Sequence, residues 1–206
     1  ERPSDYYIGN PTIPERPTQE TNLRDQAMPM NRRILLNEIP QGKLTEAHFA
    51  TDEVTILKPG DGEVLIQTLL LSQDAANRAW MQGATYRSAL SSGQVMSSGG
   101  LGRVVESNDA RFAAGDIVAG DLGWQEYAVL PGNEVAAQHP HQGPLSHGLS
   151  LLGVAGLTAY HGLINVPGIH AGEVLLVSAA GGSVGSLVGQ IGKIKGATVI
   201  GVAGGP

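Results

Sequence analysis

The pattern of apolar and polar positions changes character past the middle of the chain. Up to about residue 130, short apolar runs are separated by turn sequences such as Lys58 to Gly62 and Phe112 to Asp116. Runs of this length and spacing predict the strands of a small barrel or sandwich. The predicted strands span residues 33–37, 49–57, 63–71, 101–106, 116–119 and 124–130.

One helix and one long loop interrupt these strands. Ser72 to Met81 predicts a short helix, with Ser72 or Asp74 as its N-cap. Gln82 to Ser98 has no packing pattern and predicts an irregular loop that carries Tyr86. A tyrosine in such a loop is a candidate for a chemical role.

Helical periodicity begins at Leu145. Ser146 to Leu152 and Gly156 to Leu163 each predict a short helix. The run Val174 to Val177 then shows no alternation of apolar and polar residues, so it predicts a parallel core strand covered on both faces. Strands followed by helices predict two domains, with a boundary near residue 150.

A glycine-rich turn follows this strand. Ala179 to Gly185 leads into a predicted helix with one apolar face, and a second apolar strand follows at residues 197–202. Strand, turn, helix and strand make one βαβ unit. Such a turn lets the backbone approach a pyrophosphate, and the dipole at the helix start contributes about 0.3 to 2 kcal/mol to holding an anion. The pattern therefore predicts a dinucleotide site.

The turn departs from the dinucleotide fingerprint G-x-G-x-x-G at one position. Ala180 replaces the first glycine, whereas Gly182 and Gly185 keep the second half. A strand-to-helix turn that binds no ligand is the alternative interpretation. Three further glycines predict close packing of the helix on the sheet, and these are Gly189, Gly192 and Gly196.

The overall prediction is an α/β protein made of three parts. Residues 1–29 hold five prolines and no apolar periodicity, so they predict a disordered extension, with Met28 and Met30 as possible native starts. Residues 30–149 form the predicted β domain, and residues 150–206 an incomplete nucleotide-binding domain. Since the chain stops after the second strand of the βαβ unit, we expect it to be a fragment.

The composition argues against several classes of binding partner, among them nucleic acids, metals and membranes. The net charge is −6 and no basic cluster exceeds Arg32-Arg33, which does not favour nucleic acid. The absence of cysteine excludes disulfides, thiolate catalysis and any zinc site built on cysteine. His139 and His141 fit a surface loop better than a metal site. Without an apolar span of membrane length or a secretory signal, we expect no membrane partner and a cytoplasmic location.

Four segments together resemble the medium-chain dehydrogenase/reductase superfamily, and within it the zinc-free NADPH-dependent alkenal/one oxidoreductases, a group that includes prostaglandin and curcumin reductases. The segments are Asn31 to Arg33, Ser98 to Ser107, Leu152 to Tyr160 and Ala179 to Gly185. This resemblance covers residues 31–206. It implies a GroES-like β-barrel domain followed by the first βαβ unit of a Rossmann domain, with substrate held between the two domains.

The resemblance also implies a reaction and a site. It implies NADPH as cofactor and an α,β-unsaturated ketone or aldehyde as small-molecule substrate, with hydride delivered to the β-carbon. Negative charge then develops on the carbonyl oxygen, where Tyr86 is the candidate catalytic donor and Asn77 and Tyr86 are candidate substrate contacts. The candidate cofactor-binding residues are Thr158, Ala180, Gly181, Gly182, Ser183, Val184, Gly185 and Gly204. No metal is expected, and the group tends to form homodimers at full length.

Other roles are open for several of these residues. A packing role for Tyr86 explains its presence about as well as the catalytic role does. For Asn77 and Thr158, helix capping or an internal hydrogen bond is an equal alternative. The segment Asp74 to Arg78 also keeps only Asp74 and Arg78 of the group's Asp-Pro-Tyr-Met-Arg pattern. The lysine that grips the 2′-phosphate in the group would lie beyond Pro206.

Two other functions are compatible with the same residues. A zinc-free quinone reductase of the same superfamily would share the glycine turn, and turnover of quinones without turnover of enones would identify it. A catalytically inert fragment is the second alternative. We expect the 206-residue chain alone to have little or no reductase activity.

Overall fold

The computed structural model describes residues 30–85, 87–137 and 143–204. The predictions made for residues 1–29, for Tyr86 and for His139 and His141 lie outside these ranges.

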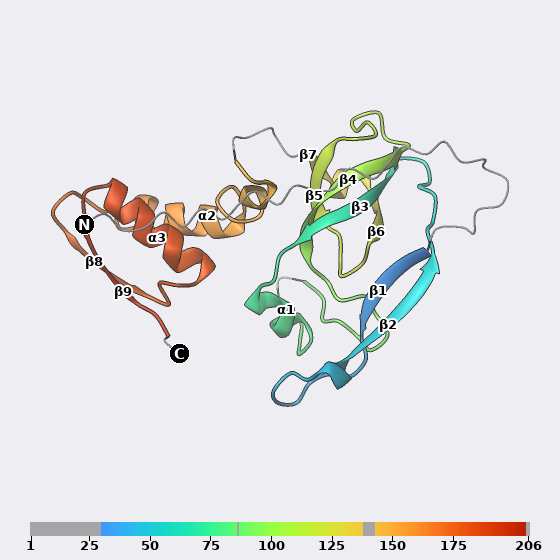
Figure 1. Cartoon of the computed structure of the whole chain (residues 1–206), viewed down its shortest axis with the longest axis horizontal. Coiled ribbons are helices and arrows are strands. Elements are labelled where there is room, and N and C mark those ends of the chain that lie inside the picture. The colour runs from blue at the N-terminus through green and yellow to red at the C-terminus, as the bar shows by residue number, and fades with distance from the viewer. Residues whose placement is uncertain (1–29, 86, 138–142, 205–206) are drawn as a thin grey trace, which may run out of the picture.

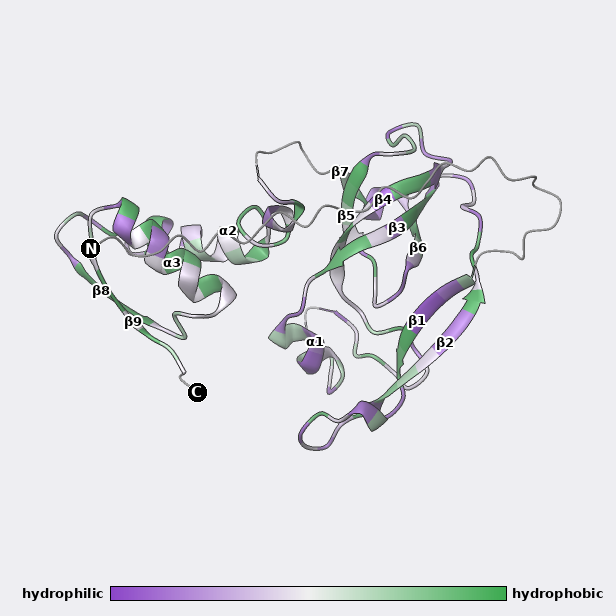
Figure 2. Cartoon of the chain, in the orientation of Figure 1, coloured by the Kyte–Doolittle hydropathy of each residue, from purple (hydrophilic) through white to green (hydrophobic). Residues whose placement is uncertain are grey.

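A five-stranded antiparallel sheet forms the centre of the first part of the chain (Figure 1). Its strand order is β6-β3-β4-β5-β7. Val64, Ile66, Val104 and Val118, all 0 or 1% exposed, pack together on its inner face. Figure 2 shows hydrophobic residues along β3, β4 and β5. The strands are β3 (Glu63–Leu71), β4 (Gly99–Ser107), β5 (Ile117–Asp121), β6 (Tyr127–Pro131) and β7 (Ala136–Ala137).

A β-hairpin completes this part of the fold. β1 (Met30–Leu36) pairs antiparallel with β2 (Phe49–Thr55), and a short 3-10 helix, η1 (Glu46–His48), precedes β2. The buried side chain of Asn31 links the hairpin to β6, because it accepts from the N–H of Tyr127 at 2.9 Å and donates to the Tyr127 carbonyl at 2.8 Å. Hairpin and sheet together form the GroES-like β-barrel domain that the resemblance implied.

The predicted helix after β3 is present as α1 (Ala75–Trp80), with Asp74 as its N-cap. The prediction that Gln82 to Ser98 lacks packing is wrong at the end of that segment. Val95 forms a β-bridge with Leu35, and Met96 is fully buried against Leu36. The local pattern did not show this packing, because the pairing partner, β1, lies far away in sequence.

The helical region after residue 143 differs in detail from its prediction. In place of a helix over 146–152 there is one 3-10 turn, η3 (Leu145–Gly148), since Gly148 and Gly153 both disfavour continued helix. The next helix, α2 (Val154–Tyr160), starts earlier than predicted and gives way to a π-helical turn, η4 (His161–Asn165). A short 3-10 helix, η2 (Gly132–Glu134), precedes β7.

The βαβ unit is confirmed. β8 (Val174–Ser178) and β9 (Thr198–Val202) are parallel neighbours, connected by α3 (Ser183–Ile194). Gly192 packs as predicted, because a side chain there would collide with Leu175 and Val199.

Gly196 has a different role from the predicted one. Gly196 follows α3 with a φ of +83°. The N–H of Gly196 donates to the carbonyl of Lys193, and the N–H of Ala197 donates to the carbonyl of Gly192, both at 3.0 Å. This is the hydrogen-bond pattern of a glycine that caps a helix C-terminus. Gly196 is thus required by its backbone angle, and a Cβ there would also lie 3.0 Å from the Cβ of Ala171, a residue outside the sheet.

The prediction that β8 is covered on both faces is also wrong for the described chain. Val174 and Leu176 are each 67% exposed, whereas Val177 is 7% exposed. α3 covers one face of the β8–β9 pair, and α2 lies beside α3 (Figure 1). A continuous apolar run therefore predicts a strand suited to burial on both faces, but not what covers each face.

Among the described residues, the structure contains no helix with both the length and the apolar character needed to cross a membrane.

Candidate functional site

A pocket of about 450 Å³ lies at the carboxyl end of β8 and the start of α3. β8 delivers the chain to this point, and the glycine turn redirects it into α3. The residues that line the pocket are Leu176, Val177, Ser178, Ala179, Gly182, Ser183, Val184, Gly185 and Val188.

Close packing requires glycine at one position of the turn and leaves little room for a side chain at a second. A Cβ on Gly185 would overlap the carbonyl oxygen of Ala179, and a Cβ on Gly182 would lie 3.2 Å from the same oxygen. Gly181 is different, since a Cβ there would meet only the methyl of Ala203 at 3.7 Å. The G-x-x-G half of the fingerprint thus allows the first turn of α3 to lie directly against the end of β8.

Ala179 adopts a left-handed backbone with φ of +49°. This conformation costs roughly 1 to 2 kcal/mol for a residue with a Cβ. The next residue, Ala180, donates its N–H to the carbonyl of Val202 at 2.9 Å, which fastens the turn to the end of β9. The chain reverses sharply at Ala179 and leaves the start of α3 facing the pocket.

The first turn of α3 presents unpaired donors. The N–H of Gly182 donates to Ala179, and the N–H of Ser186 donates to Gly182, both at 2.9 Å. Within residues 143–204, the N–H groups of Ser183, Val184 and Gly185 donate to no acceptor. Three free donors at the positive end of a helix dipole favour an anion such as a phosphate.

The structure brings only part of the predicted cofactor set to this pocket. Gly182, Ser183, Val184 and Gly185 line it, whereas Ala180 and Gly181 belong to the adjoining turn. Thr158 lies exposed on α2, and Gly204 follows β9; neither lines the pocket. The pocket is also lined by residues that were not predicted, and these are Leu176, Val177, Ser178, Ala179 and Val188. Their positions at the strand end and on one helix face could have indicated them.

The amide of Asn77, a predicted substrate contact, is engaged inside the protein. It donates to the carbonyl of Ser97 at 2.7 Å and accepts from the N–H of Asp74 at 2.7 Å, and the residue is 6% exposed. These contacts fit the internal hydrogen-bond alternative. Substrate contact by Asn77 stays a prediction, as does every role of Tyr86.

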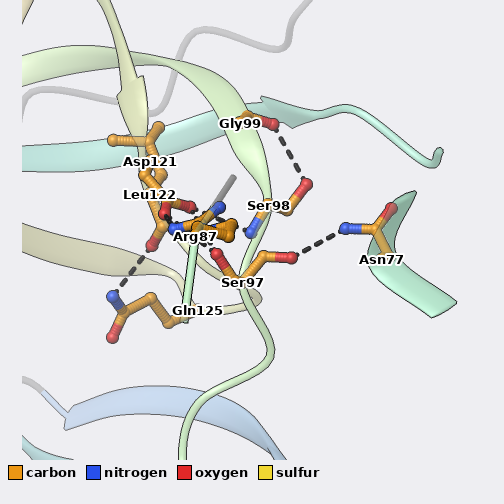
Figure 3. A network of polar contacts seen from close by, with 8 residues as sticks. All are labelled: Asn77, Arg87, Ser97, Ser98, Gly99, Asp121, Leu122 and Gln125. Carbon is orange, nitrogen blue, oxygen red and sulfur yellow. Dashed lines mark hydrogen bonds and ion pairs between the residues drawn. The ribbon is translucent and has the colours of Figure 1, made fainter. Parts of the chain in front are cut away.

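A polar network next to Asn77 was missed by sequence reasoning (Figure 3). Asp121, at the end of β5, pairs with Arg87 and accepts from the hydroxyl of Ser97 at 2.9 Å and the N–H of Ser98 at 3.1 Å. Asp121 lies far in sequence from Arg87, Ser97 and Ser98, so no local signal could have joined it to them.

Two ion pairs elsewhere shift carboxylate pKa values. Hydrogen bonds from the side chain and backbone of Arg111 lower the pKa of Asp109 to about 2. A bidentate hydrogen bond from Arg33, at 2.9 and 2.6 Å, lowers the pKa of Asp52. Both pairs lie in the β domain and are structural.

Among the described residues, no three His, Cys, Asp or Glu side chains gather as metal ligands.

Comparison with known proteins identifies relatives of this architecture. The family described as the N-terminal domain of oxidoreductase matches residues 32–137, about half of the chain. NADPH-dependent curcumin reductase of Escherichia coli is 42% identical over 176 residues, which cover 85% of this chain and 51% of that protein. The NADP(+)-dependent 2-alkenal reductase of Nicotiana tabacum is 35% identical over 180 residues, covering 84% of this chain and 52% of that protein.

A solved structure agrees with these relatives. CurA from Vibrio vulnificus, also determined in complex with NADPH, is 38% identical with a TM-score of 0.77, covering 85% of this chain and 52% of that chain. The chain spans about half the length of the curated relatives it matches. From the matched N-terminal domain and the βαβ unit that follows it, the chain belongs to the zinc-free alkenal/one oxidoreductase group of the medium-chain dehydrogenase/reductase superfamily.

Proposed function

We propose that the protein is an NADPH-dependent reductase of the C=C bond in α,β-unsaturated ketones or aldehydes. The observation that carries this proposal is the pocket at the start of α3, with free N–H groups from Ser183 to Gly185 above the turn that Gly182 and Gly185 permit. Two relatives support NADPH as the cofactor, because they are named as NADPH-dependent and NADP(+)-dependent reductases.

The chain's own residues fit the phosphates of such a cofactor. The N–H groups of Ser183, Val184 and Gly185 would hold the pyrophosphate, and the exposed hydroxyl of Ser183 can add one hydrogen bond. Beyond β9 the chain continues as Ala203 and Gly204, with no acidic side chain to repel a 2′-phosphate. When bound, NADPH supplies the hydride.

The substrate side must stabilise negative charge on the carbonyl oxygen. We propose Tyr86 as the donor that meets this charge, because a phenol can hydrogen-bond to the oxygen or transfer its proton. Asn77 would contribute the second N–H of its amide, since the first donates to Ser97. Thr158 would face the cofactor from α2. Residues 30–149 would form the substrate side and residues 150–206 the start of the cofactor side.

The decisive experiment follows the loss of reduced-nicotinamide absorbance in the full-length protein with a panel of enones, enals and quinones. Turnover of enones, lowered by Tyr86→Phe, supports both the reaction and the tyrosine's role. Turnover of quinones alone would select the quinone-reductase alternative. No turnover of either would leave the family assignment standing and overturn the proposed reaction.

Oligomeric state and location belong to the same proposal. We expect a homodimer at full length, as the family resemblance implies, and a cytoplasmic enzyme. Sedimentation of the full-length protein at several concentrations tests the first expectation, and fractionation of the source cells tests the second.

A further inference from the structure

A chain of hydrogen bonds runs from the carboxylate of Asp121 to the start of α1. The N–H of Ser98 donates to Asp121 Oδ1 at 3.1 Å, and the carbonyl of Ser97 accepts from the amide of Asn77 at 2.7 Å. The oxygen of that amide accepts from the N–H of Asp74, also at 2.7 Å. Figure 3 shows Asp121, Ser97, Ser98 and Asn77 together. The chain of bonds thus joins the end of β5, the residues before β4 and the first turn of α1.

The middle of this chain is a single peptide group. The N–H of Ser98 and the carbonyl of Ser97 belong to the same planar unit, in which the two groups point in opposite directions. The unit is buried, since Ser97 is 9% exposed and Ser98 is 0% exposed. In such surroundings a carboxylate at one end strengthens the hydrogen bond at the other, because aligned hydrogen bonds polarise one another. Asp121 therefore acts on the amide of Asn77 through this peptide group.

Asp121 also determines how the peptide group is turned. Its carboxylate accepts from the hydroxyl of Ser97 at 2.9 Å as well as from the N–H of Ser98. The hydroxyl of Ser98 donates to the carbonyl of Ser72 at 2.6 Å, which holds Ser98 in place. A peptide plane can still rotate between two fixed Cα atoms, and this rotation would carry the carbonyl of Ser97 away from Asn77. The bond from the N–H of Ser98 to Asp121 opposes the rotation.

The amide of Asn77 has one N–H left over. An asparagine side chain carries two N–H donors and one carbonyl acceptor, and Asn77 uses the carbonyl for Asp74 and one N–H for Ser97. In residues 30–85, 87–137 and 143–204, the second N–H has no acceptor. Asn77 is only 6% exposed, and buried donors in folded proteins nearly always have a partner. A donor fixed in direction and left without an acceptor is suited to the oxygen of a ligand.

We infer that Asp121 is a positioning residue for the reduction. It acts through the peptide group of Ser97 and Ser98 on Asn77, whose second N–H binds the carbonyl oxygen of the enone or enal. This inference rests on the proposed function. Since that hydrogen bond is already made in the bound substrate, losing its direction should raise KM more than it lowers kcat. Asn77, Ser97 and Asp121 do not line the nucleotide pocket, so NADPH affinity should stay the same.

The positioning can be measured without turnover, from hydrogen exchange of the Asn77 side-chain amide followed by NMR in the full-length protein. In Asp121→Ala, which leaves the N–H of Ser98 without its acceptor, this exchange should become about two- to tenfold faster, the change that corresponds to one net hydrogen bond. Asp121→Asn keeps an oxygen for that N–H and should restore part of the protection. The matched control is Glu106→Gln, which removes one charge from an exposed position on β4. The buried amide of Asn31 is the internal reference and should keep its exchange rate in every variant.

The contact with substrate is tested by steady-state kinetics with benzylideneacetone, an aromatic enone. Asp121→Ala should raise KM about two- to fivefold. Asn77→Met should raise it at least as far, because methionine, which the group has at this position, offers no N–H. In the Asn77→Met background, Asp121→Ala should cause no further rise. A merely structural role of Asp121 would instead raise KM equally in both backgrounds.

The outcomes separate the inference from the proposed function. If Asp121→Ala leaves exchange of the Asn77 amide at the rate of the Glu106→Gln control, the positioning is overturned even where enones are reduced. Faster exchange with an unchanged KM would overturn the contact between Asn77 and the substrate oxygen. If the wild-type protein reduces no enone, the proposed function and that contact both fall. The exchange rates still decide whether Asp121 positions Asn77.

Discussion

The carbonyl oxygen of Ala179 occupies the space that a side chain on Gly185 would need. This contact brings the first turn of α3 against the end of β8, where Ser183 and Val184, whose N–H groups are free, line the pocket. The G-x-x-G spacing is therefore needed for the turn to pack, whether or not a ligand binds there. Changes at these glycines should affect stability and ligand binding together.

Gly185→Ala should destabilise the protein by about 1 to 3 kcal/mol, because its methyl group must displace the Ala179 carbonyl. NADPH affinity should fall as well, since the donors of the first helical turn shift with that carbonyl. Chemical denaturation and calorimetric titration with NADPH measure the two effects. Gly181→Ala is the control, and an equal loss of stability there would contradict this explanation.

Ala179→Val should also destabilise the protein, by about 1 to 2 kcal/mol or more, because a β-branched residue is strongly disfavoured at a φ of +49°. Ala179→Gly should be neutral or stabilising, since glycine adopts this backbone angle freely while losing more entropy on folding. Denaturation of both variants beside wild type gives the comparison. A stability loss of equal size in the two would show that backbone angle is not the cause.

Asn77→Ala should cost about 1 to 3 kcal/mol, because it leaves the carbonyl of Ser97 and the N–H of Asp74 without their buried partner. If Asn77 also contacts substrate, KM for an enone should rise in addition. Denaturation and steady-state kinetics on the same preparation separate these contributions. The exposed Asn133→Ala serves as control and should change neither.

The pKa of Asp109, held at about 2 by Arg111, predicts an acid dependence of stability. Because the carboxylate pKa is lower in the folded than in the unfolded protein, its contribution is present above pH 3.8 and is lost as the pH falls toward 2. In Arg111→Ala, NMR titration of Asp109 should show its pKa raised part of the way to 3.8, since the backbone N–H of residue 111 can still donate. Arg103→Ala should leave the Asp109 titration unchanged.

Much of the fold could be predicted because its signals are local. Apolar runs bounded by turns indicate the strands of the β domain, Asp74 indicates the start of α1, and the glycine turn indicates the βαβ unit. These features depend on neighbours within a few residues, where backbone preference and side-chain alternation are decisive.

Several of the failures share one cause, which is contact between distant residues. Burial of Met96 depends on Leu36, and the exposure of Val174 and Leu176 depends on which elements pack over β8. Neither is visible in the local pattern. Gly192 and Gly196 look alike in sequence, and only the packed structure separates close approach to the sheet from a left-handed helix cap.

The candidate site divides in the same way. By itself the sequence determined the glycine turn, because its geometry needs small residues at fixed spacing within one strand-to-helix connection. Only the tertiary structure decided that Asn77 is committed to Ser97 and that Asp121 joins Arg87 to Ser97 and Ser98. The physical reason is that hydrogen bonds and ion pairs between elements depend on where the folded chain places each group. Composition and periodicity do not determine that placement.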